Sequence, residues 1–191
     1  MEKFSKLKGK YKFEELKDEI LYQDDNLKVV KYEDWSIVKE KNTVVCIPFL
    51  IESNQMVLRH EYIPTFKYVD GQEYHITVVG GCIEYDESAE KALLRELEEE
   101  TGIVIRDDYK IDLDFKPFFI TKGSTNKIYP FILPLSERDY SEILARGDGS
   151  DVESKSKSVK IDVKYINSIN PSDLITDYML LKLKEYLNIQ I

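Results

Sequence analysis

The segment GCIEYDESAEKALLRELEEETGI, residues 81–103, contains one well-bounded helix with an unusual distribution of charge. Ser88 suits the N-cap, because its hydroxyl can accept a hydrogen bond from the first turn, and Gly102 suits the left-handed stop after the last turn. The alanines and leucines between them favour a helix. Four carboxylates crowd its C-terminal half: Glu96, Glu98, Glu99 and Glu100. That end of a helix carries partial negative charge, and a Lys or Arg there would be favoured by roughly 0.3–1 kcal/mol.

A bound cation would explain this arrangement. Glu96 and Glu100 are four residues apart, so they lie on one helix face and repel each other. Mg²⁺ prefers carboxylate oxygens and completes its coordination with water and substrate phosphates. Gly80 and Gly81, at the start of the segment, allow the backbone to approach a ligand closely. The residues therefore predict a magnesium site for a phosphate-containing ligand, and the alternative is a solvated charged face.

Composition limits the class of protein. The chain has 191 residues, of which 42% are hydrophobic and 33% charged, as in a soluble globular protein with one main domain and an appendage. A net charge of −9 argues against a nucleic-acid surface. Cys46 and Cys82 form no metal-binding pattern. The first residues carry no apolar signal segment, and the longest apolar run, residues 44–51, is too short to span a bilayer. We expect a cytoplasmic protein without nucleic-acid or membrane partners.

The order of elements predicts an α+β fold with a mixed sheet between helices. Strands are expected at two positions around an Asp34 turn in residues 27–40, and at residues 43–52, 56–63, 66–69, 73–79, 109–120, 127–135 and 159–166. The pair at 66–69 and 73–79 flanks Asp70-Gly71, a strong hairpin signal. Helices are expected at residues 13–23 and 170–187, the second capped by Asn170 or Ser172. The polar residues 136–158 are expected to form a surface loop.

The opening segment resembles the signature of the Nudix hydrolases, G-x5-E-x7-R-E-U-x-E-E-x-G-U, in which U is a bulky aliphatic residue. Every required position is filled without a gap, by Gly81, Glu87, Arg95, Glu96, Leu97, Glu99, Glu100, Gly102 and Ile103. The resemblance covers residues 42–188 and implies the Nudix fold, a mixed sheet sandwiched between helices. A small β appendage precedes it.

The resemblance also implies an activity and a set of catalytic residues. Nudix hydrolases use Mg²⁺, or alternatively Mn²⁺, to hydrolyse a nucleoside diphosphate linked to a group X, giving a nucleoside monophosphate and a phosphorylated X. By position, the metal ligands and catalytic carboxylates would be Glu96, Glu99 and Glu100, with the backbone carbonyl of Gly80 as a further metal ligand.

Other signature positions would be structural. Glu87 and Arg95 would form an ion pair that orients the loop and the helix, and Leu97 and Ile103 would be core residues.

The chain most resembles the ADP-ribose and nucleotide-sugar pyrophosphatase branch. That branch has an Arg-Gln-Tyr-Arg-Pro type segment where residues 58–66 read LRHEYIPTF, with Ile63 in place of the second arginine. Two further departures are Val79-Gly80-Gly81 for Pro-Ala-Gly and Asn126 where a glutamate is common. In this branch a loop acid reaches the metal centre, and among Asp148, Asp151 and Glu153 we favour Glu153 as catalytic.

Two upstream residues are candidates for substrate binding. Arg59 could meet a phosphate, or it could be an ordinary surface arginine on a strand. Tyr62 could stack on a base, or it could be a core aromatic residue.

The resemblance also suggests a domain organisation and a partner. Residues 1–40 are expected to be an appendage with dimerisation strands that include Trp35, and residues 41–191 the Nudix domain of a homodimer. The best candidate substrate is ADP-ribose or a nucleotide sugar. One alternative is hydrolysis of a nucleoside triphosphate or a dinucleoside polyphosphate. Another is a non-catalytic domain that senses a nucleotide.

Overall fold

The computed structural model describes residues 19–24, 27–111, 116–151 and 153–189, and of Glu153 it describes the backbone alone. The described residues form two compact units. The smaller contains the described residues up to Glu40 together with Gly123–Thr125, and the larger contains the rest. None of the helices in these ranges is long and apolar enough to cross a membrane.

The smaller unit is a three-stranded antiparallel sheet in the order β1-β2-β3. Its strands are β1 (Glu19–Gln23), β2 (Lys28–Tyr32) and β3 (Trp35–Lys39). The two strands expected around Asp34 are thus confirmed. The helix expected at residues 13–23 is wrong for its second half, because β1 pairs along β2 instead, and residues 13–18 lie outside the described part.

The larger unit is built on a seven-stranded mixed sheet in the order β12-β5-β4-β10-β9, with β6 added to β5 and β7 added to β4. Its strands are β4 (Thr43–Leu50), β5 (Gln55–Tyr62), β6 (Tyr74–Thr77), β7 (Val79–Cys82), β9 (Phe118–Phe119), β10 (Lys127–Leu135) and β12 (Lys157–Asp162). β10 runs parallel to β4, and the other pairs are antiparallel. β4 and β5 pair only next to their turn, at Phe49↔Met56 and Leu50↔Gln55. Beyond that point they diverge, and β7 and β6 take the freed edges.

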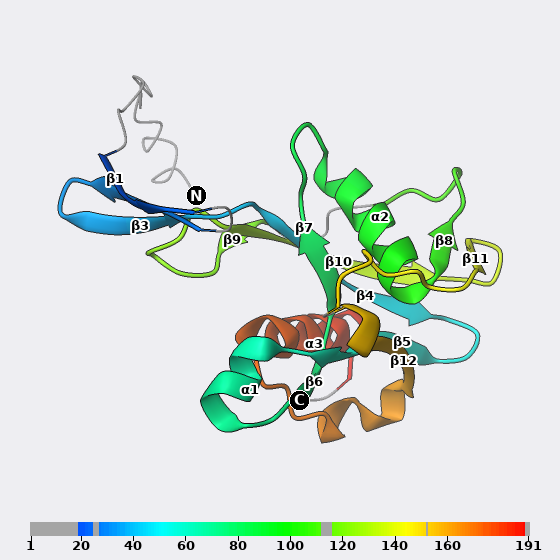
Figure 1. Cartoon of the computed structure of the whole chain (residues 1–191). Helices are drawn as coiled ribbons and strands as arrows, with labels where there is room; N and C mark the ends of the chain where they lie inside the picture. Colours follow the sequence, from blue (N-terminus) through cyan, green and yellow to red (C-terminus); the bar gives the residue numbers. More distant parts are fainter. Residues whose placement is uncertain (1–18, 25–26, 112–115, 152, 190–191) are drawn as a thin grey trace, which may run out of the picture. The chain divides into compact units, whose positions relative to one another are not determined.

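Helices cover both faces of this sheet (Figure 1). Alternate residues of β4 divide between two hydrophobic clusters, so that Val45 and Ile47 pack toward α3 (Leu174–Tyr186) while Val44 and Cys46 pack toward α2 (Ala89–Thr101). Because both faces are buried, β4 is apolar along its whole length, as residues 43–52 suggested. The expected α+β architecture is confirmed.

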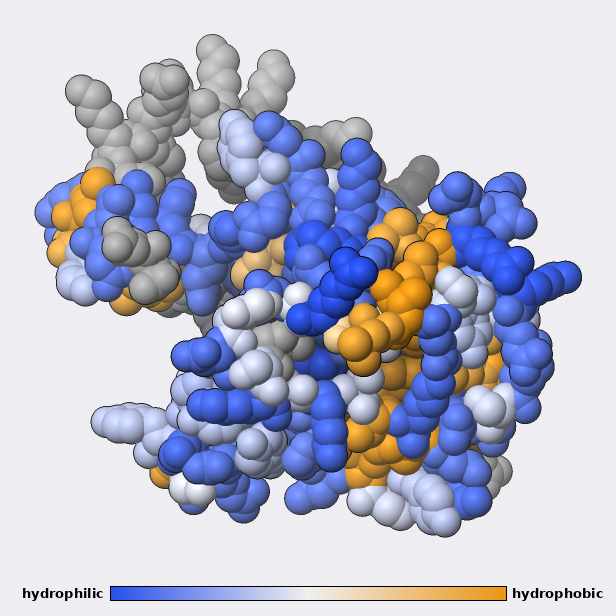
Figure 2. Space-filling model, turned by 45° about the vertical axis from the view of Figure 1, so that its right-hand side comes forward, coloured by the Kyte–Doolittle hydropathy of each residue, from blue (hydrophilic) through white to orange (hydrophobic). Residues whose placement is uncertain are grey.

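The remaining elements lie around this sheet. β8 (Ile103–Ile105) follows α2 directly and pairs with β11 (Tyr140–Glu142). Two 3-10 helices, η1 (Glu153–Lys155) and η2 (Val163–Ser168), flank β12. The face drawn in Figure 2 is mostly hydrophilic, with hydrophobic surface gathered mainly in one band.

The hairpin expected around Asp70-Gly71 is wrong. Its first arm is the helix α1 (Pro64–Asp70). Pro64 occupies the first helical turn, where its missing N–H costs nothing, and Gly71 ends the helix with φ 79° and donates its N–H to the carbonyl of Lys67. The end signals of a helix therefore outweighed the strand propensity of the aromatic residues between them.

Three other expectations need correction. The strand expected at 109–120 is reduced to β9 among the described residues, since 112–115 lie outside them. The strand expected at 159–166 begins earlier and gives way to η2, whose cap is Asp162, and the cap of α3 is Asp173 rather than Asn170 or Ser172. The loop expected at 136–158 contains β11 and η1. The strand at 127–135 and the helix between Ser88 and Gly102 are confirmed.

Candidate active site

The C-terminal end of α2 is held by donors from two other segments. The N–H of Gly147 donates to the carbonyl of Glu99 at 2.8 Å, and Nη1 of Arg59 donates to the carbonyl of Glu100 at 2.8 Å. Arg59 comes from β5 and is only 2% exposed. A cation at this position is what the helix dipole favours. The acidic end of α2 is therefore compensated by a buried arginine.

A second arginine, Arg95, gathers three carboxylates. Its Nε and Nη2 donate to Glu87 at 3.1 and 3.0 Å, and its Nη1 donates to Glu96 at 2.7 Å and to Glu99 at 3.1 Å. Nη2 also donates to the carbonyl of Cys82 at 2.9 Å. The hydrogen bonds with Glu87 raise the pKa of Arg95 and lower the pKa of Glu87. The expected ion pair is confirmed, and it extends to two of the proposed metal ligands.

Glu96 lies against the backbone of β7. A Cβ added at Gly81 would be 2.2 Å from Oε1 of Glu96, so any other residue here would displace this carboxylate. Burial raises the pKa of Glu96 despite the hydrogen bond from Arg95, which lowers it. The glycine thus allows an ionisable group to be packed where water solvates it poorly.

Glu100 is more firmly fixed. Its Oε2 accepts the N–H of Gly80 at 2.9 Å, and its Oε1 lies 3.5 Å from Nε of Arg59. The residue is 8% exposed. In an antiparallel ladder the N–H and C=O of one residue point to the same side of the strand. We therefore expect the carbonyl of Gly80 to point toward the same space as Glu100.

These groups line a cleft of about 410 Å³, named here the acidic cleft. Its backbone wall is Gly80–Cys82 in β7. Six of the described carboxylic residues line it: Glu61, Glu84, Glu96, Glu99, Glu100 and Asp148. Of the described cationic residues, Lys41 and Arg95 do so. The excess of acid in a confined space favours a cationic ligand.

The donor set suits a hard divalent cation, although its side chains are not arranged around one. Among the described residues, no three Asp, Glu, His or Cys side chains are placed to hold a metal ion. Glu96 and Glu99 are turned to Arg95 instead. Because Mg²⁺ is bound by one or two carboxylates plus water and phosphate oxygens, a full protein cage is not needed. Arg95 engages Oε1 of Glu96 and Oε2 of Glu99, so a cation bound at this cleft would compete with Arg95 for these two carboxylates.

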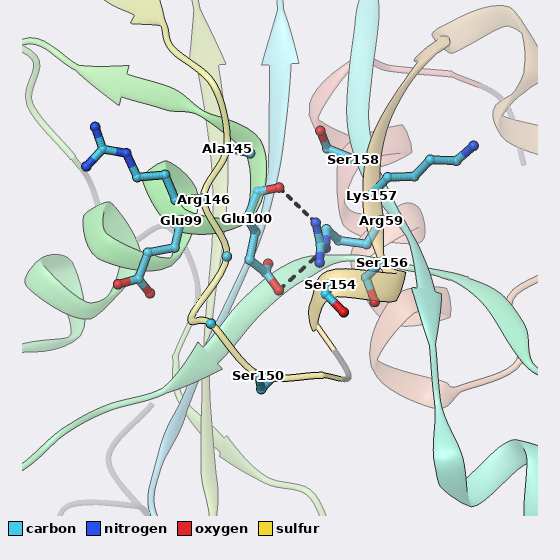
Figure 3. Close-up of a pocket in the computed structure, with 12 residues that line it drawn as sticks. Arg59, Glu99, Glu100, Ala145, Arg146, Ser150, Ser154, Ser156, Lys157 and Ser158 are labelled. Atoms are coloured by element: carbon cyan, nitrogen blue, oxygen red, sulfur yellow. Dashed lines mark hydrogen bonds and ion pairs between the residues drawn. The ribbon is translucent and has the colours of Figure 1, made fainter.

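A second cavity of about 350 Å³ shares Glu99 and Glu100 with the acidic cleft (Figure 3). We name it the serine pocket. Its other lining residues are Arg59, Ala145, Arg146, Gly147, Gly149, Ser150, Ser154, Ser156, Lys157 and Ser158. Figure 3 shows the ion-paired Arg59 and Glu100 at its centre, while the side chains of Arg146 and Lys157 point outward.

The structure brings together Glu96, Glu99, Glu100 and Gly80, all of which line the acidic cleft. Arg59 lines the serine pocket and is buried, so the surface alternative is wrong for it. Tyr62 lines neither cavity, and its ring centre lies 4.5 Å from Nζ of Lys155 and meets Tyr74 edge-on at 5.8 Å. The prediction for Glu153 stays a prediction, because its side chain lies outside the described part.

The sequence interpretation missed Glu61. This residue lies two positions after Arg59 on β5, and side chains two apart in a strand share a face. Its Oε2 accepts a hydrogen bond of 2.6 Å from the hydroxyl of Thr77 on β6. Because Arg59 was already a candidate, the alternation of side chains along a strand would have identified Glu61 as a second residue on the same face.

Asp148 is the loop acid that lines the acidic cleft. Its Oδ1 accepts the N–H of Ser150 at 2.8 Å, and hydrogen bonds from Ser150 lower the pKa of Asp148. Asp151 lines neither cavity. The described part of the loop therefore presents Asp148 to the site rather than Asp151.

Comparison with known proteins places these features in a family. The sequence profile of the NUDIX domain matches residues 39–155, and comparison with curated protein sequences gave no match. A solved structure named "Crystal structure of ADP compounds hydrolase" superposes with a TM-score of 0.64 over 91% of this chain and 92% of that chain. Its sequence is 18% identical, a level at which the likeness establishes the fold alone.

Proposed function

Because the chain belongs to the Nudix hydrolase family, we propose that it hydrolyses the pyrophosphate bond of a nucleoside diphosphate linked to a second group X. The products are a nucleoside monophosphate and a phosphorylated X. The observation that carries this proposal is the acidic cleft, in which Glu96, Glu99 and Glu100 lie beside the glycine backbone of β7.

The proposed metal ligands are these three glutamates and the carbonyl of Gly80. A bound Mg²⁺ or Mn²⁺ would neutralise the pyrophosphate and polarise its phosphoryl oxygens. The chain's own contribution is to hold the carboxylates in one place before substrate arrives. The N–H of Gly80 fixes the carboxylate of Glu100. Arg95 holds the carboxylates of Glu96 and Glu99 at the cleft wall.

A carboxylate must also accept the proton of the attacking water. Asp148 lines the acidic cleft, and the N–H of Ser150 holds its carboxylate in place by donating to its Oδ1. We propose Asp148 for this role ahead of Asp151, with Glu153 as the alternative. Asp148→Asn should therefore lower kcat more than Asp151→Asn, and equal effects would remove Asp148 from the role.

ADP-ribose or a nucleotide sugar is the proposed substrate class. A nucleoside triphosphate brings more negative charge, and of the described cationic residues the acidic cleft offers just Lys41 and Arg95 to meet it. The similar structure is named as a hydrolase of ADP compounds, which supports the same class. Both substrate classes share the pyrophosphate chemistry, so the choice depends on measured selectivity.

The test is a substrate panel in Mg²⁺, in Mn²⁺ and after chelation, with products separated by chromatography. We expect the highest kcat/KM for ADP-ribose or a nucleotide sugar, and no turnover after chelation. In ¹⁸O-labelled water, label should appear in only one of the two products, which identifies the attacked phosphorus. A triphosphate ahead of every diphosphate-linked compound would overturn the substrate class, and turnover without a divalent cation would overturn the mechanism.

We also propose that the smaller unit joins two copies of the chain. Its strands carry large exposed side chains: Ile20, Leu21, Tyr22, Tyr32 and Trp35. A three-stranded sheet with exposed apolar groups gains stability from a covering surface. Sedimentation should give a dimer for the full chain, and Trp35→Glu should shift it toward monomer. A wild-type monomer at micromolar concentration would exclude this proposal.

A further inference from the structure

We propose that the Asp148-Gly149 pair is a site of spontaneous isoaspartate formation, and that this change removes the proposed catalytic carboxylate from the acidic cleft. The second half of the inference rests on the proposed function, because it takes Asp148 as the group that accepts the proton of the attacking water. The first half depends only on the local structure of the chain.

The chain contains two Asp-Gly pairs, Asp70-Gly71 and Asp148-Gly149, which are alike in several respects. All of these residues are exposed, and the glycines have positive φ, 79° and 86°. Oδ1 of each aspartate accepts the N–H of the residue that follows the glycine, at 3.0 Å from Gln72 and at 2.8 Å from Ser150. A Cβ added at either glycine would have no atom within 4 Å, so both glycines have open space around them.

The two pairs differ in the hydrogen bonding of the glycine N–H. The N–H of Gly71 donates to the carbonyl of Lys67 at 3.1 Å at the end of α1. Gly149 lies in the loop between β11 and η1, and within the described part of the chain its N–H donates no hydrogen bond. A bonded N–H must first open locally before it can react, whereas an unbonded one in an exposed loop is already accessible. Asp148-Gly149 is therefore the more reactive pair.

The reaction needs no reagent other than water. The nitrogen of Gly149 bonds to Cγ of Asp148, and the hydroxyl group of the carboxylic acid leaves as water with the amide proton. Water then opens the resulting cyclic imide at either of its carbonyl carbons. Opening at Cγ restores aspartate, whereas opening at the main-chain carbonyl leaves Cγ in the main chain as isoaspartate. Glycine favours the attack, because it has no side chain to hinder it.

Isoaspartate moves the carboxylate away from its place in the site. The main chain gains a methylene group at residue 148, and the carboxylate is then attached directly to Cα. The oxygen that accepts the N–H of Ser150 is thereby displaced. The N–H of Gly147 binds the carbonyl of Glu99, so the loop stays attached to α2 just before the change. We expect the modified chain to keep its fold and to lose most of its turnover.

Peptide mapping tests the site of modification. The wild-type chain is incubated at neutral pH and physiological temperature, and fragmentation mass spectrometry quantifies isoaspartate in the peptides that contain Asp70 and Asp148. We expect isoaspartate to accumulate about fivefold faster at Asp148, the factor that corresponds to the one hydrogen bond on Gly71. Equal rates, or a faster rate at Asp70, would overturn the inference.

Matched glycine variants test the cause. Gly149→Ala adds a methyl group next to the attacking nitrogen, so isoaspartate at residue 148 should largely stop accumulating. Gly71→Ala is the control, because it places the same methyl group at a similar positive φ in equally open space. Isoaspartate at Asp148 should form in this control as in the wild type. Formation at the wild-type rate in Gly149→Ala would contradict the proposed reaction, and the wild-type map decides the site even if a variant folds poorly.

Activity is followed in the same samples. The turnover rate with ADP-ribose, relative to fresh protein, should fall with the fraction of isoaspartate in the wild type and in Gly71→Ala, and stay constant in Gly149→Ala. Asp148→Asn forms the same ring by loss of ammonia, so that variant is assayed fresh. Isoaspartate at residue 148 without loss of turnover would overturn the inactivation. If the fresh wild-type chain hydrolysed no ADP compound, the proposed function would fail, while the map would still decide whether Asp148-Gly149 is modified.

Discussion

The acidic cleft and the serine pocket share Glu99 and Glu100 but differ in almost everything else. Among the described residues, six carboxylic side chains and a glycine backbone line the cleft, whereas serines and the buried Arg59 line much of the pocket. The cleft has an excess of acid, but in the pocket Arg59 is paired with Glu100. One helix end therefore borders two cavities of different charge, with Glu99 and Glu100 in the wall of both.

The two arginines at this helix end differ in burial and in the number of carboxylates that each one binds. Arg95 has 31% of its side chain exposed and holds Glu87, Glu96 and Glu99, which are 15%, 13% and 32% exposed. Arg59 is buried and holds Glu100. Arg95 thus divides its guanidinium among three carboxylates at the protein surface, whereas the Arg59–Glu100 pair is buried, and breaking a buried pair is costly. We call Glu96 and Glu99 the exchangeable carboxylates, because we propose that they turn from Arg95 to the cation, and we assign Glu100 to the fixed frame.

The largest expected effect is on the exchangeable carboxylates. Glu96→Gln and Glu99→Gln should each lower kcat roughly 1000-fold at saturating Mg²⁺, equivalent to about 4 kcal/mol, because each removes charge that we propose to hold the cation. Thermal stability should stay near wild type, since Arg95 keeps Glu87 and one other carboxylate. The matched control is Glu84→Gln, which lines the same cleft but pairs with Lys41 at its edge. A variant that retained near-wild-type kcat would identify a carboxylate that is not a metal ligand.

The next effect is on the fixed frame. Arg59→Met should lower the free energy of unfolding by about 3 kcal/mol, because it leaves the buried Glu100 without its counter-charge. Arg138→Met is the control: that arginine is 88% exposed, lies 3.7 Å from Asp139, and should change stability by less than about 0.5 kcal/mol. Denaturant titration measures both. Equal, small changes would show that Arg59 is no more structural than a surface arginine.

The contrast between these arginines also explains what the sequence could predict. Ser88, Gly102 and the Glu87–Arg95 pair depend on short-range chemistry at fixed spacing, and the structure has all three features. The Arg59–Glu100 pair joins residues 41 positions apart, and only the pairing of strands and the packing of α2 decide that it is buried. No local pattern separates such an arginine from a surface one.

The segment 136–158 shows the same limit. Its polar composition suggested a loop, yet the N–H of Ile143 donates to the carbonyl of Gly102 and Gly147 binds Glu99. These contacts join backbone N–H and C=O groups, which nearly every residue has, so amino-acid composition cannot predict them. A Cβ at Gly102 would lie 2.0 Å from the carbonyl oxygen of Ile143, which shows how closely the segment packs against the helix end.

A smaller effect should follow from crowding Glu96. Gly81→Ala adds a methyl group that would lie 2.2 Å from Oε1 of Glu96. The carboxylate is the far end of a flexible side chain, so it should move while the fold is retained, and kcat should fall about tenfold. The control is Gly71→Ala, where φ is 79° and no atom lies within 4 Å of the new Cβ. It should cost about 1 kcal/mol of stability through backbone strain and leave kcat unchanged. A loss of kcat in the control alone would reverse the assignment.

The smallest expected effect tests whether Glu61 is a fixed carboxylate, like Glu100, or an exchangeable one. Its carboxylate lines the acidic cleft, yet Thr77, which is 7% exposed, donates a hydrogen bond of 2.6 Å to it. If this bond fixes Glu61 in the wall, Thr77→Val and Glu61→Ala should be coupled by about 1 kcal/mol in unfolding free energy, the net contribution of a typical intramolecular hydrogen bond. A double-mutant cycle isolates that coupling from the change in volume at Thr77. Mg²⁺ affinity, measured by calorimetry, should change little in Thr77→Val. A coupling below about 0.3 kcal/mol, within the error of additive sites, would place Glu61 with the exchangeable carboxylates Glu96 and Glu99 instead.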